Sequence, residues 1–187
     1  MTGVDWSENS IRYAKQLCRG LSAEFLCVSY LDPMPQRNFD GAVMISQDYG
    51  VLASQDRKKL LANIRAALKT GGRFAFDVSS TAAFENLKQN ASQIWEAAAE
   101  GFWRAHPHLT LQKLFLFPDV PASCSLYVVI DEETTVYRVW QTYFTPESIE
   151  RELHENGFEV EEISADLAGG AWRSDSPALG VVCRKRE

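Results

Sequence analysis

The chain has 187 residues, of which 45% are hydrophobic and 11% aromatic, and its formal net charge is −6. This length and composition predict a single globular domain, residues 1–187, with an apolar core. The acidic balance argues against nucleic acid or an anionic membrane surface as the main partner, because both select for clustered Lys and Arg.

The lack of a visible targeting signal and the pattern of cysteines both bear on the cellular compartment. No apolar run approaches the roughly 20 residues that a membrane-spanning helix needs, and the first ten residues lack the apolar stretch of a secretory signal. The four cysteines form no CxxC pair and each has apolar neighbours, which is typical of buried, reduced thiols. We therefore expect a cytoplasmic protein.

The first part of the chain, residues 1–79, alternates between strand and helix patterns. Ser7 and Ser54 can each cap a helix, and Gly71-Gly72 is expected to end the second helix. The alternation predicts an α/β fold with a mostly parallel sheet and helices on both faces. The expected strands are residues 2–4, 24–29, 39–46 and 73–78.

The second half has a different pattern. Residues 93–144 contain aromatic, alternating runs separated by turn residues, which predicts antiparallel strands. No linker precedes this block, so we expect an insertion packed on the sheet. Thr145-Pro146-Glu147 is typical of a helix start, and that helix should end at Asn156-Gly157. Two last strands are expected near 158–163 and 178–183.

Polar residues follow three of the strands expected in the first half. The carboxyl ends of parallel strands form the edge where open α/β sheets bind ligands. Asp5 can accept two hydrogen bonds from a ribose there, or it can cap the helix beside Ser7. Trp6 offers a flat face for a purine, or it is an ordinary partly buried aromatic residue.

Two more loops lie at the same expected edge. The backbone amides of Ser29-Tyr30-Leu31-Asp32 could contact an adenine, although the side chains of Tyr30 and Leu31 suit the core equally well. Ser46-Gln47-Asp48-Tyr49 follows the strand expected at 39–46.

The order of these segments resembles the class I S-adenosylmethionine-dependent methyltransferases. The segments GVDWSENSIRYA, FLCVSYLDPMP, FDGAVMISQDYGVL and LKTGGRFAFDV carry the resemblance in the first half. LYVVIDEE, VYRVWQTYFTPESI and ENGFEVEEI fit a branch of small bacterial methyltransferases. The resemblance implies a Rossmann-like methyltransferase fold and S-adenosyl-L-methionine as cofactor. The cofactor-binding residues that it implies are Asp5, Trp6, Ser29, Tyr30, Leu31, Ser46 and Gln47.

The sequence departs from the family in two places. The family's glycine-rich GxGxG loop and the central strand before it have no counterpart, so the resemblance implies that the N-terminal part is missing. Losing a central strand exposes backbone groups, and a buried unpaired one costs about 1–3 kcal/mol. Ser29 stands where the family often has an acid, and a hydroxyl is a weaker acceptor than a carboxylate.

The resemblance places Ser46, Gln47 and Asp48 where the methyl donor meets the acceptor. Asp48 is the candidate catalytic residue, since it can orient the acceptor or take its proton, or it can simply cap nearby amides. Methyl transfer is an in-line displacement that depends chiefly on positioning, so a general base is optional. The candidate substrate contacts are Tyr49, Trp103 and Tyr143. The insertion at residues 93–144 is expected to cover the substrate as a cap. His106 and His108 lack a third ligand and do not predict a metal site.

These observations leave alternatives open. The first is methyl transfer to a small-molecule acceptor, impaired by the missing N-terminal part. The second is a truncated, inactive methyltransferase-like domain that acts as an interaction or oligomerisation module. Exposed strand edges are templates for pairing, so a homodimer is expected under both. A nucleotide- or NAD-binding α/β protein is a third, but it needs the same glycine-rich loop.

Overall fold

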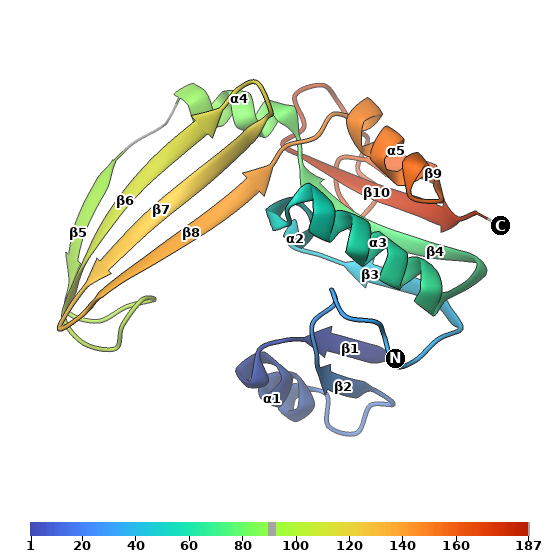
Figure 1. The fold of residues 1–187 in the computed structure, drawn as a ribbon, viewed down its shortest axis with the longest axis horizontal. Coiled ribbons are helices and arrows are strands. Elements are labelled where there is room, and N and C mark those ends of the chain that lie inside the picture. Colours follow the sequence, from blue (N-terminus) through green and yellow to red (C-terminus); the bar gives the residue numbers. More distant parts are fainter. Residues whose placement is uncertain (90–92, 187) are drawn as a thin grey trace.

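The structure is a computed structural model that describes residues 1–89 and 93–186. Its elements follow the chain in an alternating order that becomes strand-rich in the second half (Figure 1). They are β1 (Thr2–Asp5), α1 (Glu8–Leu17), β2 (Glu24–Cys27), β3 (Phe39–Met44), α2 (Asp48–Val51), α3 (Ser54–Ala67), β4 (Leu68–Ser79), α4 (Thr81–Gln89), β5 (Ile94–Ala98), β6 (His108–Phe117), β7 (Ala122–Ile130), β8 (Thr134–Thr142), α5 (Pro146–Glu155), β9 (Phe158–Ser164) and β10 (Ala178–Lys185).

The strands form three sheets. β1 and β2 make a parallel pair, β3-β4-β10-β9 form a mixed four-stranded sheet, and β5-β6-β7-β8 form an antiparallel one. Figure 1 shows the β5–β8 sheet as an arm on one side of the β3-β4-β10-β9 sheet, with β1, β2 and α1 below that sheet. The arm lies within residues 93–144, where the aromatic alternation places it.

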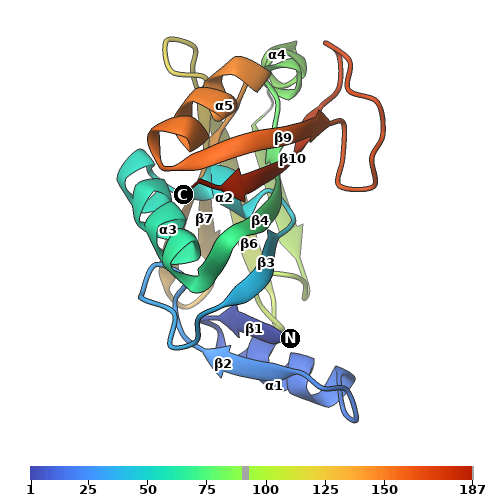
Figure 2. The ribbon, with the colours of Figure 1, turned by 90° about the vertical axis from the view of Figure 1, so that its right-hand side faces the viewer.

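The expected mostly parallel sheet is not confirmed. Within the described residues, β1–β2 and β3–β4 are the parallel strand pairs, and the other named pairs are antiparallel. The reason is that β10 returns beside β4 in the opposite direction and β9 pairs with β10 as its antiparallel neighbour. Helices α3 and α5 lie on the same side of this sheet (Figure 2).

The main core lies between the β3-β4-β10-β9 sheet and these two helices. Phe74, Phe76 and Val78 alternate along β4 and are fully buried, and the rings of Phe74 and Phe76 stack 4.6 Å apart. Leu61 from α3 and Ile149 from α5 pack into the same cluster. Burying each such side chain contributes about 1.5–3 kcal/mol, which makes this sheet the rigid part on which the loops are mounted.

Two helix starts agree with the sequence patterns, whereas a third start and one helix end do not. Ser7 caps α1 as expected, but Ser54 is the first residue of α3 and does not cap it, because Ala53 occupies the N-cap without a side-chain hydrogen bond. Thr145 and Ser148 form a reciprocal capping box, and Pro146 is the first residue of α5. The prediction that Gly71-Gly72 ends the second helix is wrong. That helix ends at Ala67 because β4 begins at once with Leu68, which pairs with Phe39, so both glycines lie within the strand.

Helices α2 and α4 are additions to the expected pattern. Both are short. Three residues separate α2 from the end of β3, and one residue separates α4 from the end of β4. None of the described helices is long and apolar enough to cross a membrane.

Candidate functional site

A groove of about 300 Å³ runs between β1 and β3. The β3 side is lined by every residue from Gly41 to Met44, followed by Ile45, and the β1 side by Thr2, Val4 and Asp5. Side chains of a strand alternate between its faces, so a run of consecutive lining residues means that the backbone edge of β3 faces the groove. Apolar side chains of α3 and β4 form the floor.

Asp5 lies at the carboxyl end of β1, in the groove lining. Its Oδ1 accepts a 2.7 Å hydrogen bond from the backbone N–H of Ser7, the residue that caps α1. Asp5 thus supports the capping residue, while Ser7 Oγ itself accepts from the N–H of Ser10. Within the described residues, the other oxygen of Asp5 makes no hydrogen bond. Trp6 follows directly and its side chain is 81% exposed, so its ring is open to a ligand or to solvent.

The loop after β2 is held against α3 by a residue that the sequence patterns did not single out. The side-chain amide of Asn63 donates hydrogen bonds to the carbonyl oxygens of Tyr30 and Asp32, at 3.1 and 3.0 Å. Ser29 Oγ accepts from the backbone N–H of Leu31 at 3.1 Å, which closes a local turn. Asn63 is polar beside the apolar residues Leu60 and Ile64, and that break in the pattern is the signal that could have found it.

The loop after β3 has an unusual backbone. Ser46 and Gln47 have φ values of 71° and 62°, in the left-handed region that non-glycine residues rarely adopt. Gln47 is held there by its N–H, which donates to Asp77 Oδ1 at 3.1 Å, and by its amide oxygen, which accepts from the Ser79 hydroxyl. Two strained residues in succession persist only where the surroundings fix them, and such positions cluster at functional sites.

Carboxylates converge at this end of the groove. Burial, and then the charges of Asp5 and Asp77, raise the pKa of Asp48. Burial, and then Asp48 and Asp5, raise the pKa of the Tyr30 hydroxyl. Asp77 is a site residue that the sequence analysis missed, although a lone acid near the end of the apolar run FAFDV is a visible signal. The loops after three strands and the end of β4 therefore meet here.

The three expected substrate contacts do not join this groove. Tyr49 is fully buried and its hydroxyl donates to Glu152 at 2.5 Å. Tyr143 is 9% exposed, with its hydroxyl 2.9 Å from that of Ser123. Trp103 lies on the arm, with its ring centroid 4.9 Å from those of Tyr127 and Tyr137.

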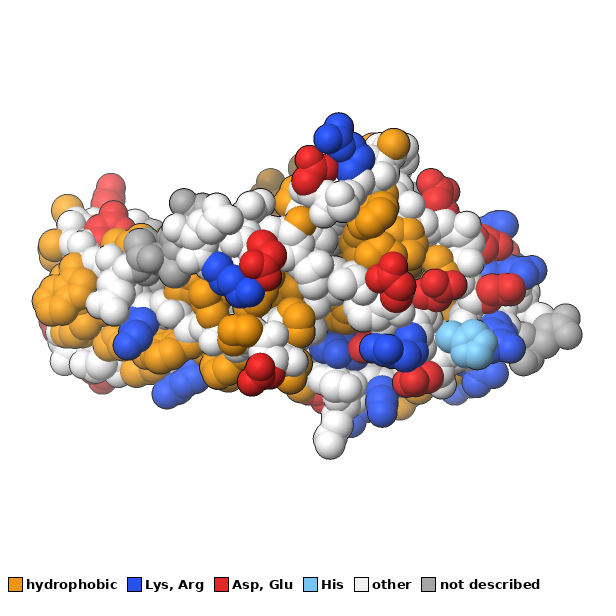
Figure 3. Space-filling view, turned by 90° about the horizontal axis from the view of Figure 1, so that it is seen from above, with side chains coloured by type: hydrophobic (Ala, Val, Ile, Leu, Met, Phe, Trp, Pro, Cys, Tyr) orange, Lys and Arg blue, Asp and Glu red, His pale blue; other side chains and the backbone are white. Residues whose placement is uncertain are grey.

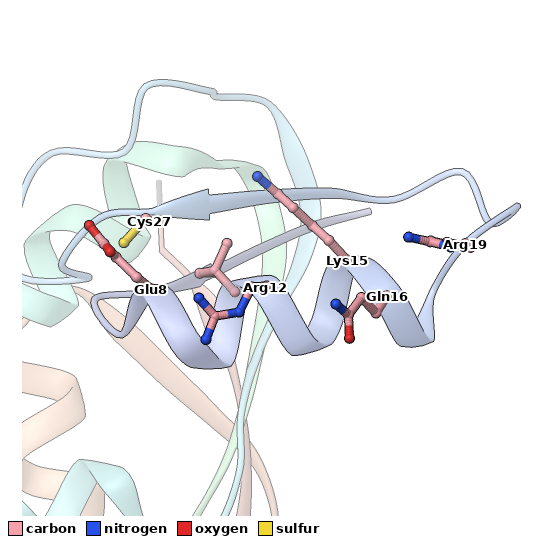
Figure 4. A pocket seen from close by; sticks show the side chains of 7 residues that line it. Glu8, Arg12, Lys15, Gln16, Arg19 and Cys27 are labelled. Carbon is pink, nitrogen blue, oxygen red and sulfur yellow. The ribbon is translucent and has the colours of Figure 1, made fainter.

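A second hollow lies on the surface of α1 (Figure 4). The helix lines it with Glu8, Arg12, Lys15 and Gln16, and Arg19 beyond the helix and Cys27 of β2 complete the lining. These side chains extend into solvent and are exposed, so the hollow has no buried polar group that would specify a ligand. Across the described residues, no three His, Cys, Asp or Glu side chains gather as a metal site would require.

Residues 1–72 match the family model described as a methyltransferase domain. No curated protein matches the chain in sequence. Among solved structures, the chain is similar to an S-adenosylmethionine-dependent methyltransferase from Clostridium acetobutylicum ATCC 824, with 17% identity and a TM-score of 0.73 over 100% of this chain and 75% of that one. It is similar to the CcbJ methyltransferase from Streptomyces caelestis, with 14% identity and a TM-score of 0.72 over 100% and 74%.

A further similar structure is the glycopeptide N-methyltransferase MtfA complexed with S-adenosyl-L-methionine, with 18% identity and a TM-score of 0.59 over 97% of this chain and 75% of that one. At these identities the structural likeness establishes a common fold. The family-model match over residues 1–72 and the fold shared with S-adenosylmethionine-dependent methyltransferases agree with the resemblance that the sequence shows.

Proposed function

We propose that the chain transfers a methyl group from S-adenosyl-L-methionine to a small-molecule acceptor, with the groove between β1 and β3 as the cofactor site. The observation that carries the proposal is the convergence of Asp5, Tyr30 and Asp48 in one groove, at the carboxyl ends of parallel strands. The carboxyl ends of parallel strands are where open α/β sheets bind ligands.

The groove suits a cation that also carries hydroxyl groups. Asp5 and Asp77 are close enough to Asp48 for their charges to raise its pKa. The described residues that line the groove include neither Lys nor Arg. Three carboxylates favour a positively charged ligand, and a carboxylate oxygen of Asp5 can accept from ribose hydroxyls. The carboxylates of the groove therefore fit the sulfonium, the amino group and the ribose of the cofactor.

Each loop is assigned a different part of the cofactor. We assign the ribose to Asp5, the purine face to the exposed Trp6 ring, and the adenine edge to the backbone of Ser29-Tyr30-Leu31. Ser46 and Gln47 would face the amino acid part, in a backbone shape fixed by Asp77 and Ser79. When bound, the cofactor supplies an electrophilic methyl group for in-line displacement, which depends chiefly on positioning.

Asp48 is the group that handles the acceptor's proton in this proposal. Its raised pKa makes the carboxylate a better proton acceptor than an ordinary aspartate. The acceptor approaches from the Asp48 side. The buried Tyr49 supports this position through Glu152, and Trp103 and Tyr143 stabilise the arm that caps the acceptor.

The class of acceptor is proposed from the acidic surface and from the similar structures. The net charge of −6 suits a small molecule better than a nucleic acid. MtfA is described as a glycopeptide N-methyltransferase, and another similar structure, KedS8, as a sugar N-methyltransferase. We propose that the acceptor here is also a small molecule with an amine or a hydroxyl.

A second candidate function is that of a non-catalytic interaction module. It is favoured by the open edges of β1 and β3. Among the strands that the structure describes, β1 pairs only with β2 and β3 only with β4, and the other edge of each lines the groove. Open strand edges accept further strands. The sequence also contains no GxGxG loop of the kind that the family uses for its cofactor.

Calorimetric titration with S-adenosylhomocysteine distinguishes the two candidates. We expect micromolar binding by the wild-type chain, and at least about tenfold weaker binding, about 1.4 kcal/mol, by Asp5→Ala. Asp175→Ala is the matched control, because Asp175 is a surface acid with its side chain 72% exposed. A folded wild-type chain that binds no S-adenosylhomocysteine would refute the proposed cofactor site and favour the interaction module.

A further inference from the structure

The two faces of the β5–β8 sheet differ in chemistry. The strand register aligns Phe115, Cys124 and Trp140 across three strands, and it aligns Leu111, Val128 and Val136 in a second row. These rows share one face, because residues two apart on a strand point to the same side. We name this surface the open face and define it by the apolar side chains of Leu111, Phe115, Phe117, Leu126, Val128, Val136 and Trp140.

The opposite face is more polar and is partly covered by the chain itself. It carries Thr110, Ser123 and Thr135, among others. Trp103 stacks on its Tyr127 and Tyr137, and at its other end Gln141 lies so near Gly50 of α2 that a Cβ there would overlap the Gln141 amide. The covered face is thus the polar one, which is the reverse of the usual arrangement in a one-layer sheet.

The open face leaves large apolar side chains in water. Phe115 is 39% exposed, Val136 42% and Trp140 47%, and the rings of Phe117 and Trp140 stack with centroids 5.4 Å apart. No helix crosses this sheet in Figure 1, and Figure 3 shows hydrophobic side chains gathered over the arm. Contiguous exposed apolar patches of this kind mark interaction surfaces.

The charged groups of the open face lie at its rim. Lys113 and Arg138 stand in one row on either side of Leu126. Arg138 is on the edge strand β8, and the recorded pairing of β5 with β6 stops at Gln112, so Lys113 is also beside a free edge within the described residues. The Lys113 ammonium group lies 5.0 Å from the centroid of the Phe115 ring, so this side chain lies over apolar surface of the open face. An apolar centre with a charged rim is the anatomy of a protein interface.

We propose that the open face packs against the open face of a second copy of this chain, sheet on sheet. β6, β7 and β8 have nine or ten residues each and β5 has five. At about 3.4 Å per residue and about 4.8 Å per strand, the sheet face covers roughly 540 Å² per copy. Two copies then bury about 1,100 Å², slightly more than the roughly 1,000 Å² that a biological interface should exceed. A two-fold dimer uses the same surface on both subunits, so the open face alone can form the whole interface. The proposal does not depend on the methyltransferase activity.

The mass in solution tests this proposal with a matched pair of variants. Val136 and Val139 lie on the same strand at 42% and 48% exposure, but on opposite faces of the sheet. We expect the wild-type chain to sediment at twice its 21.0 kDa mass. Val136→Glu should weaken the dimer about 100-fold or more, because it buries a carboxylate in an apolar interface, whereas Val139→Glu should leave the dimer intact.

Three results would overturn the proposal. The first is a wild-type chain that remains monomeric at high micromolar concentration. The second is a dimer that survives both Val136→Glu and a second variant of the open face, Phe117→Lys. The third is dissociation by both valine variants, which would assign the contact to the edge of β8 and not to its face. Far-UV circular dichroism of each variant establishes that it is folded, since all three positions are exposed at the surface.

Discussion

Arg57 of α3 donates two hydrogen bonds to the carboxylate of Glu152 on α5, at 2.7 and 3.0 Å. Their side chains are only 8% and 18% exposed. The same carboxylate accepts from Tyr49, and Arg57 also donates to the carbonyl of Leu52 at 2.8 Å. The pair therefore joins both helices to α2, the short helix that begins with Asp48.

Glu152→Gln should destabilise the chain by about 3 kcal/mol, because it leaves the buried Arg57 charge without its partner. Urea unfolding followed by circular dichroism measures this free energy. The control is Asp175→Asn, which removes the exposed ion pair with Arg173 and should cost less than about 1 kcal/mol. Equal losses for the two variants would show that the Arg57–Glu152 pair does not stabilise α2 as the structure indicates.

Asp131, in the turn between β7 and β8, predicts a pH dependence. The backbone N–H of Glu133, then Arg104 and His106, lower the pKa of Asp131 to about 2. A carboxyl with a lowered pKa in the folded state contributes stability above its ordinary pKa, and that contribution is lost as the pH falls from about 4 to about 2. The stability difference between wild type and Asp131→Asn should therefore be larger at pH 7 than near pH 2. Urea midpoints at a series of pH values measure it, and a difference that is constant with pH would contradict it.

The backbone of Ser46 predicts a stabilising substitution. A left-handed conformation costs a non-glycine residue about 1–2 kcal/mol, and glycine removes that cost. Glycine also increases the conformational entropy of the unfolded chain, which offsets part of the stabilisation. Ser46→Gly should therefore raise the free energy of unfolding by about 0.5 kcal/mol, as thermal unfolding can show. The same change in the helical backbone of α1, Ser10→Gly, should lower it by about 0.5–1 kcal/mol. If Ser46→Gly also destabilises the chain, the strained backbone is not present in solution.

The sequence alone predicts the strands and helices better than their assembly. Local signals such as the Thr145 capping box and the alternation in 108–117 act within a few residues, so they can be read directly. The pairing of β10 beside β4 depends on contacts between residues about a hundred positions apart, for which one sequence holds no local signal. The mostly parallel sheet was therefore an expectation that the strand pairing did not confirm.

The site residues divide in the same way. Asp5, Tyr30 and Asp48 follow strand ends and could be found by that rule, and the structure brings them to one groove. Tyr49 and Tyr143 were chosen as aromatic residues near the expected site, but alternation alone does not say which face of a strand or turn is buried. Asn63 and Asp77 act on loops that are distant in sequence, so their roles required the tertiary structure.

Asp77→Asn should lower the pKa of Asp48, because the charge of Asp77 is one of the causes that raise it. The asparagine oxygen can still accept the hydrogen bond from the Gln47 N–H, so the loop should keep its shape. Burial is the leading cause and is unchanged, so the pKa of Asp48 should remain above its ordinary value.

The carboxyl carbon resonance of Asp48, followed by NMR over pH, measures the shift. Asp5→Asn is the companion variant and should lower the pKa of Asp48 by at least as much, because Asp5 contributes more than Asp77. If Asp48 takes the acceptor's proton, the acid limb of the pH–rate profile must move to lower pH in both variants. An unchanged profile together with a lowered pKa would mean that Asp48 orients the acceptor without taking its proton.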